Sequence, residues 1–138
     1  MKHVFIINPK SNSETFTEKF RHKIEELCVN RGLEFEIKSA AKNLDAENFA
    51  RQAAEKGDAV RVYACGGDGT VNEVVNGIFG FKNAELAVIP IGTGNDFIRT
   101  FGDIKKFFDI ETVIDSKARP IDAIKINDRI CINIANIG

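Results

Sequence analysis

The chain has 138 residues, of which 43% are hydrophobic and 28% charged, and its formal net charge is -1. This length and composition fit one globular domain and exclude a disordered, collagen-like or membrane-spanning protein. Because no basic surplus exists to hold a phosphate backbone, nucleic acid is not expected as a partner. The three cysteines, Cys28, Cys65 and Cys131, are odd in number and far apart. They argue against a disulfide framework and favour a reducing, cytoplasmic setting.

Predicted strands and helices alternate in the first part of the chain. Residues 4–7 form an apolar run that predicts a buried strand, and the run is too short for a signal peptide or a membrane span. A helix is expected next, because apolar side chains recur three and four positions apart. They are Phe16, Phe20, Ile24, Leu27 and Cys28. Residues 30–32 supply the stop, and alternating apolar residues at 33, 35 and 37 predict a second strand.

A second helix is expected to have Asp45 as its cap and to end at Gly57. Residues 59–65 then predict a third strand and residues 86–91 a fourth. The helix between them has an apolar inner face formed by Val71, Val74, Val75 and Ile78. This alternation predicts an α/β fold, with a parallel sheet and helices on both faces. Such sheets bind ligands at the carboxyl ends of their strands.

Residues 119–138 depart from this alternation. Isoleucines at every second or third position lie on both sides of Asn127-Asp128, which predicts two strands joined by a tight turn. The expected division is therefore an α/β lobe at residues 1–118, followed by a hairpin at 119–138 that leads into a β-rich domain missing from this chain.

Gly66, Gly67 and Gly69 surround Asp68 where the third strand meets the next helix. Glycines let phosphate oxygens approach the main chain, and the positive end of a helix dipole lies at such a place. Thr70 and Glu73 have the spacing of a capping box, so the alternative is that both only close the helix start. Asp68 would repel phosphate unless it holds a metal-bound water, orients a donor or accepts a hydroxyl proton. Its alternative role is to favour turn geometry.

A second glycine loop, residues 92–96, repeats the order of strand, small residues and helix start. Thr93 lies between two glycines and is the better candidate for binding, whereas Asn95 and Asp96 serve equally well as helix caps. The chain has no Gly-x-x-x-x-Gly-Lys-[Ser/Thr] sequence, and Asn72 stands where a dinucleotide fingerprint needs glycine. Spacing alone therefore predicts a phosphate-binding α/β domain and does not specify its substrate.

Four blocks of the sequence resemble the catalytic domain of diacylglycerol kinases, in the bacterial lipid kinase branch that is also similar to sphingosine kinases. They are residues 8–11, 66–77, 90–97 and 133–138. The resemblance implies an α/β lobe like that of NAD kinases and diacylglycerol kinases, with ATP between it and a larger β-rich lobe. It also implies Mg²⁺ as a cofactor and transfer of the γ-phosphoryl group to a lipid hydroxyl at the membrane surface. The enzyme would be cytoplasmic and only peripherally in contact with the membrane.

The resemblance also implies which residues bind the nucleotide. They are Asn8, Pro9, Lys10, Ser11, Asn12, Ser39, Gly66, Gly67, Asp68, Gly69, Thr70, Val71, Asn72, Glu73 and Thr93. Asp68 is the candidate catalytic residue, but the general base and a structural magnesium site look to lie in the missing domain, so no metal ligand is assigned. Many relatives have glycine where this chain has Asn12. Asparagine tolerates left-handed geometry, so the turn is expected to survive there.

Two other readings stay open. The Gly-Gly-Asp-Gly-Thr pattern is also similar to NAD kinases and phosphofructokinases, although residues 72–77 and 92–96 favour the lipid branch. A nucleotide-binding module without catalytic activity is the second alternative. The isolated chain is expected to bind nucleotide weakly and to lack kinase activity, and its oligomeric state stays open, a homodimer included. Core packing is favoured over a lipid-facing surface for five phenylalanines, Phe79, Phe81, Phe101, Phe107 and Phe108.

Overall fold

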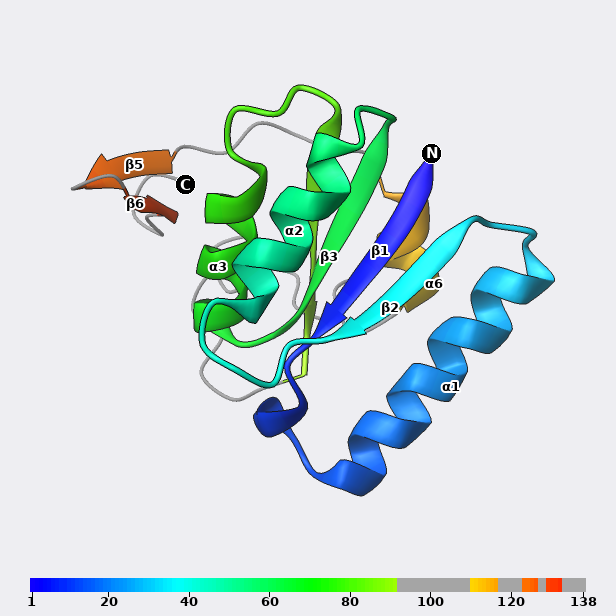
Figure 1. Cartoon of the computed structure of the whole chain (residues 1–138). Helices are drawn as coiled ribbons and strands as arrows, with labels where there is room; N and C mark the ends of the chain where they lie inside the picture. Colours follow the sequence, from blue (N-terminus) through cyan, green and yellow to red (C-terminus); the bar gives the residue numbers. More distant parts are fainter. Residues whose placement is uncertain (92–109, 117–122, 127–128, 133–138) are drawn as a thin grey trace.

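The computed structural model describes residues 1–91, 110–116, 123–126 and 129–132. Four strands form one parallel sheet in the order β2-β1-β3-β4 (Figure 1). In chain order they are β1 (Lys2–Ile7), β2 (Phe35–Ser39), β3 (Val60–Gly66) and β4 (Ala84–Pro90). The predicted α/β fold with a parallel sheet is confirmed.

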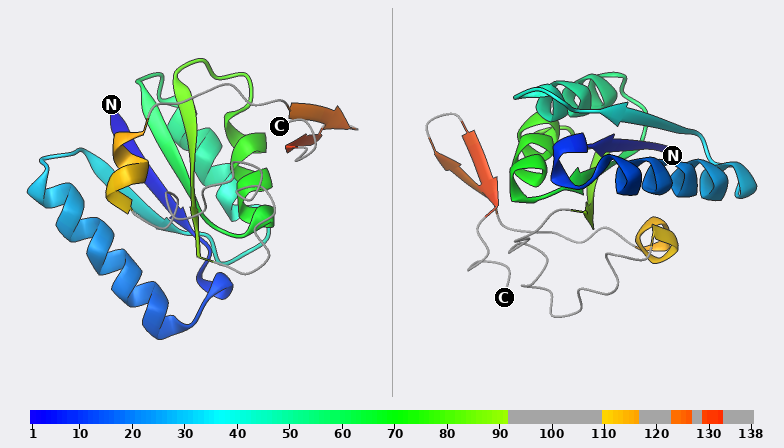
Figure 2. Two further views of the ribbon diagram at one scale, coloured as in Figure 1. Left: turned by 180° about the vertical axis from the view of Figure 1, so that it is seen from behind. Right: turned by 90° about the horizontal axis from the view of Figure 1, so that it is seen from below.

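Helices cover both faces of the sheet (Figure 2). On one face lie α2 (Asp45–Glu55) and α3 (Asp68–Ile78), and on the other lie α1 (Glu14–Asn30) and α6 (Ile110–Asp115). Successive side chains of a strand point to opposite faces. Val4 and Ile6 therefore pack under α2 and α3, whereas Phe5 and Ile7 pack under α1 and α6. Burying one such side chain stabilises the fold by about 1.5–3 kcal/mol. An apolar run without alternation is what a strand covered on both faces requires.

The two helices on the first face approach each other closely at Gly77 of α3. A Cβ atom at this position would lie 2.4 Å from the backbone oxygen of Glu47 and 2.7 Å from the Cβ of Ala50. Arg51 of α2 adds one polar contact across this junction, donating to the carbonyl of Asn76 on α3 at 3.3 Å. It also donates to Glu47 Oε2 at 3.2 Å, one turn away within α2. Gly77 is therefore needed for the close approach of α2 and α3.

The start of α2 differs from the prediction. The N-cap residue is Leu44, which has a φ of 67° and makes no side-chain cap. Asp45 is the first residue inside the helix, and its Oδ2 accepts a hydrogen bond from the backbone N–H of Lys42 at 3.0 Å. The predicted capping role of Asp45 is therefore wrong, because its carboxylate closes the preceding turn instead. Gly57, with a φ of 88°, follows the helix end as expected.

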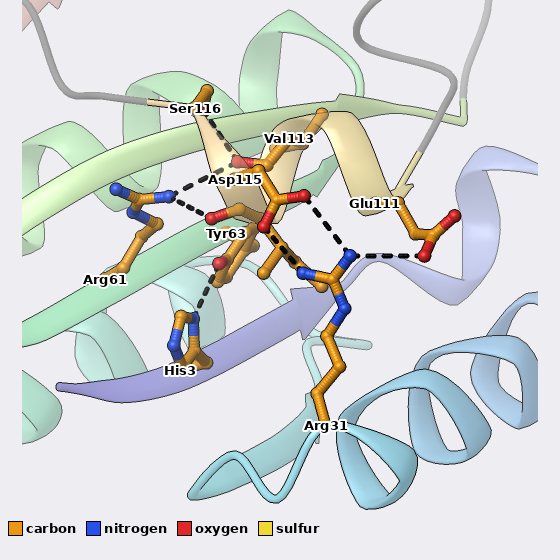
Figure 3. Close-up of polar contacts among 9 residues, drawn as sticks. His3, Arg31, Arg61, Tyr63, Glu111, Val113, Asp115 and Ser116 are labelled. Carbon is orange, nitrogen blue, oxygen red and sulfur yellow. Dashed lines mark hydrogen bonds and ion pairs between the residues drawn. The ribbon is translucent and has the colours of Figure 1, made fainter.

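A buried arginine holds the carboxyl end of α6 (Figure 3). Arg61 on β3 is only 8% exposed, and its Nη1 donates to the carbonyls of Val113 at 3.3 Å and Ile114 at 2.8 Å. Its Nε donates to Glu85 Oε2 on β4 at 3.0 Å. The last carbonyls of a helix lack partners within the helix, and a cation stabilises the negative end of its dipole. Arg61 therefore fastens this short helix to the sheet.

Other polar contacts surround the same helix (Figure 3). Arg31, just after α1, pairs with Asp115 at 2.6 Å and with Glu111 at 3.1 Å. Its guanidinium lowers the pKa of the Asp115 carboxyl. Nearby, His3 Nδ1 lies 2.6 Å from the hydroxyl of Tyr63, and both residues are buried. Burial, reinforced by the charge of Arg61, lowers the pKa of His3.

The predicted pair of strands near the C-terminal end is confirmed. β5 (Ala123–Ile126) and β6 (Arg129–Ile132) pair in antiparallel fashion, and the two residues between them lie outside the described residues. The backbone of β6 lies beside α3. The predicted division at residues 118 and 119, with a β-rich domain to follow, stays a prediction.

Candidate functional site

The carboxyl ends of the parallel strands meet at one edge of the sheet, the lower edge in Figure 1. Ser39 ends β2, Asn8 follows β1, Gly67 follows β3 and Ile91 follows β4. Sequence segments predicted to bind the nucleotide are therefore brought together from separate parts of the chain, at the edge where α/β sheets bind ligands. Thr93 and the rest of the second glycine loop lie outside the described residues.

The first loop is a short 3-10 helix, Pro9–Ser11, that directly follows β1. Asn8 caps it, with Oδ1 accepting a hydrogen bond from the N–H of Lys10 at 3.0 Å. The backbone N–H of Asn8 donates to the carbonyl of Cys65 on β3 at 2.9 Å, so the loop starts in contact with the end of the neighbouring strand. Pro9 suits the first helical position, where an N–H has no partner within the helix. Lys10 is exposed beside this loop.

Side chains link the first loop to the glycine turn after β3. Asn8 Nδ2 donates to Thr70 Oγ1 at 3.5 Å, and Thr70 is only 4% exposed. A Cβ atom at Gly66 would lie 2.4 Å from Thr70 Oγ1 and 3.2 Å from Ser11 Oγ. Only glycine at position 66 leaves room for the side chains of Thr70 and Ser11. Three predicted nucleotide contacts, Asn8, Ser11 and Thr70, lie around this one point.

The helix start next to this turn has no side-chain cap. Its N-cap is Gly67 and its first residue is Asp68. The alternative of a capping box is therefore wrong, because the box would make Thr70 the N-cap. A Cβ atom at Gly69 would meet nothing within 4 Å among the atoms that the structure describes. Among the described residues, the first turn of α3 is therefore open at Gly69, and helix N-termini with free space beside them can bind anions.

The remaining predicted nucleotide contacts on α3 differ in how far their side chains are buried. Val71 is buried in the core and its N–H donates to the carbonyl of Gly67 at 3.2 Å, so its side chain serves packing. Asn72 and Glu73 are half-buried one turn along the helix. Asp68 is half-buried at the very start, with one carboxylate oxygen buried. Its position places a negative charge at the positive end of the helix dipole.

A pocket of about 390 Å³ opens beside this edge, between β2 and α1. Apolar, hydroxyl and charged side chains line it. They are Ile7, Pro9, Glu14, Thr17, Glu18, Arg21, Ile37, Lys38 and Ser39. Its volume lies in the range of about 300–1,000 Å³ that is usual for small-molecule sites. Two of the predicted nucleotide contacts, Pro9 and Ser39, line this pocket.

Asn12 follows the 3-10 helix in extended backbone, with φ -152° and ψ 179°. Any residue adopts this conformation, so the left-handed geometry that asparagine tolerates is not used at Asn12, and the turn before it forms as a 3-10 helix. The side chain instead donates from Nδ2 to the carbonyl of Ile91 at 2.8 Å, and its Oδ1 accepts from the N–H of Ser13 at 2.7 Å. No sequence pattern predicted this contact. The only signal for it was that polar residues follow a buried strand.

Metal binding by protein groups alone is not supported in this part of the molecule. Within the described ranges, no three His, Cys, Asp or Glu side chains gather in a way that could hold a metal ion. The same residues contain no helix that is both long enough and apolar enough to cross a membrane.

The chain is similar to known kinases along nearly its whole length. The profile of the diacylglycerol kinase catalytic domain matches residues 2–126. A protein of Bacillus subtilis named diacylglycerol kinase is 40% identical over 138 residues, covering 96% of this chain and 44% of that protein. One of Staphylococcus haemolyticus with the same name is 37% identical over 137 residues, covering 96% of this chain and 40% of that protein. The chain thus spans less than half the length of these relatives.

A solved structure shows the same fold. The crystal structure of a diacylglycerol kinase from Bacillus anthracis matches with a TM-score of 0.69 and 30% sequence identity. The match covers 94% of this chain and 48% of that one.

Proposed function

This chain belongs to the diacylglycerol kinase catalytic domain family, and on that premise we propose that it is the nucleotide-binding lobe of an ATP-dependent lipid kinase. The kinase transfers the γ-phosphoryl group of ATP to a hydroxyl of a diacylglycerol-like lipid, which it meets at the membrane surface from the cytoplasm. Residues 1–118 form the ATP-binding lobe, and residues 119–138 lead into a β-rich domain that completes the cleft. Relatives named diacylglycerol kinase support this activity.

The observation that carries the proposal is the uncapped start of α3. Its N-cap is a glycine, and Gly69 opens onto space within the described part of the chain. A triphosphate placed there accepts hydrogen bonds from main-chain N–H groups and gains from the helix dipole. Such binding depends on backbone geometry, which explains why the sequence needs glycines there and no Walker-type lysine.

The rest of the nucleotide is proposed to lie along the carboxyl edge of the sheet. Asn8, Ser11 and Thr70 surround the end of β3, next to the proposed phosphate position. The exposed Lys10 supplies a positive charge beside the same loop. The pocket lined by Pro9 and Ser39 has the size and the mixed walls that suit the nucleoside end. Thr93 completes the proposed set from the second glycine loop.

We propose that Mg²⁺ binds at this site mainly through the phosphates of the nucleotide. Mg²⁺ commonly binds to one or two carboxylates, several waters and the phosphates of the substrate. Asp68, at the start of α3, is the one carboxylate in the glycine turn and is proposed to hold the ion or a water bound to it. Bound Mg²⁺ supplies charge neutralisation for the phosphates.

The role of the protein in the reaction is mainly positioning. The main chain at the start of α3 holds the phosphates, and the sheet edge aligns the γ-phosphoryl group with the acceptor. The bond from the γ-phosphorus to the bridging oxygen breaks, a bond to the lipid oxygen forms, and ADP leaves. The proton of the lipid hydroxyl passes to a base that we place in the β-rich domain.

The test is phosphoryl transfer from labelled ATP by the full-length protein, with diacylglycerol, a sphingoid base, NAD and fructose 6-phosphate as acceptors. Labelled diacylglycerol is the expected product. Labelling of NAD alone would replace the lipid kinase by an NAD kinase-like enzyme. Binding of ATP without labelling of any acceptor would favour an inactive nucleotide-binding module. For the 138-residue chain alone, weak ATP binding and no transfer are expected.

A further inference from the structure

The side chain of Asn12 connects two segments of the site that are 79 positions apart in the sequence. Its Nδ2 donates to the carbonyl of Ile91 at 2.8 Å, while its Oδ1 accepts from the N–H of Ser13 at 2.7 Å. The first contact needs a donor and the second an acceptor, so the orientation of the amide group follows from its partners. Each end of the amide is thus engaged by the protein itself.

Asn12 is one of two anchors of the first loop. The other is Asn8, whose Nδ2 donates to Thr70 on α3. These two asparagines lie at the two ends of the 3-10 helix Pro9–Ser11. The loop is therefore fastened at one end to α3 and at the other to the end of β4. The N–H of Ile91 also donates to the carbonyl of Gly66 at 3.3 Å, which ties the end of β4 to the glycine turn.

We propose that Asn12 is a positioning residue, whose side chain fixes the first loop against the end of β4 and so holds Asn8 and Ser11 beside the start of α3. This inference rests on the proposed function, because that helix start is where the triphosphate is proposed to bind. The role differs from the direct nucleotide contact that the family resemblance implies for this position. Glycine at this position could form neither side-chain bond, so the tether depends on the asparagine.

The experiment compares Asn12→Asp and Asn12→Gly with the unchanged chain, using ATP and inorganic tripolyphosphate with Mg²⁺ as probes. Asn12→Asp keeps the acceptor for Ser13 but loses the donor to Ile91. Losing one such hydrogen bond should weaken binding about 3- to 10-fold. Both probes should weaken by the same factor, because the loop acts on the phosphate position. Asn30→Asp adds the same charge at the far end of α1 and should leave both affinities unchanged.

A pH series adds a readout that loss of stability would not reproduce. Protonated aspartic acid has a hydroxyl that can donate to the Ile91 carbonyl. The affinity ratio between Asn12→Asp and the unchanged chain should therefore return toward one as the pH falls to about 4, while the ratio for Asn12→Gly should not. Affinities are measured where circular dichroism shows that each variant is folded.

Three outcomes would overturn the inference. Asn12→Asp and the unchanged chain could bind both probes equally well, which would remove the positioning role and leave the proposed function intact. Weaker binding of ATP with normal binding of tripolyphosphate would show that Asn12 contacts the nucleoside directly. Binding of neither probe by the unchanged chain, even at the highest probe concentrations, would overturn the proposed phosphate site at the start of α3, and this inference with it.

Discussion

Gly66→Ala should push apart the first loop and the start of α3. The added Cβ would lie 2.4 Å from Thr70 Oγ1, 2.9 Å from Thr70 Cβ and 3.2 Å from Ser11 Oγ. Thr70 is almost fully buried, so it cannot simply swing into solvent. Overfilling a packed site costs about 1–3 kcal/mol. Restricting the unfolded chain offsets about 0.4–1 kcal/mol of this, so the free energy of unfolding should fall by about 1–2 kcal/mol.

Gly69→Ala is the matched control for this prediction. Gly69 is helical, and a Cβ there meets nothing within 4 Å among described atoms. Replacing a glycine inside a helix by alanine should raise the free energy of unfolding by about 0.5–1 kcal/mol. Urea unfolding followed by far-ultraviolet circular dichroism measures both variants. If Gly66→Ala proves as stable as the unchanged chain, the turn has room for a side chain and the packing argument is wrong.

Three further predictions concern the rest of the fold. Gly77→Ala places a Cβ atom 2.4 Å from the backbone oxygen of Glu47, which costs about 1–3 kcal/mol, and the helical gain of alanine over glycine offsets about 0.5–1 kcal/mol of this. The free energy of unfolding measured in urea should therefore fall by about 1–2 kcal/mol. Unchanged stability would contradict the close approach of α2 and α3. Arg61→Met should cost about 1.5–3 kcal/mol through the lost hydrogen bonds to α6 and Glu85, and amide hydrogen exchange in α6 should speed up. Exchange at an unaltered rate would show that Arg61 does not hold this helix. Because burial lowers the pKa of His3, the unfolded chain binds the proton more readily, so stability should be full above about pH 6.5 and fall below it. In the His3→Gln variant, the urea midpoint should depend less on pH. If the midpoint falls as steeply with pH as in the unchanged chain, His3 is not the cause.

The sheet and its helices could be predicted because each depends on local sequence. The apolar run at residues 4–7 indicated a strand covered on both faces, and its residues do divide between two cores. The order of strand and glycine turn placed the site at the carboxyl edge of the sheet. These features follow from side-chain periodicity and from the need to bury apolar surface.

Contacts between distant residues could not be predicted in the same way. The bond from Asn12 to Ile91 joins residues 79 positions apart, and no periodicity encodes it. The start of α3 was also ambiguous, because Thr70 and Glu73 have the spacing of a capping box, whereas the N-cap in the structure is Gly67. Phe79 was expected in the core but is 56% exposed, whereas Phe81 packs partly buried against the core. Phe101, Phe107 and Phe108 lie outside the described residues.

The central claim is that the main chain at the start of α3 holds the phosphates of a nucleotide. It is tested most directly by titrating isotope-labelled chain with ATP and Mg²⁺ and following the backbone amide resonances. The largest changes should occur at Gly67, Asp68 and Gly69, with smaller ones in the first loop. Saturable binding that leaves these three amides unchanged and shifts resonances elsewhere would contradict the claim.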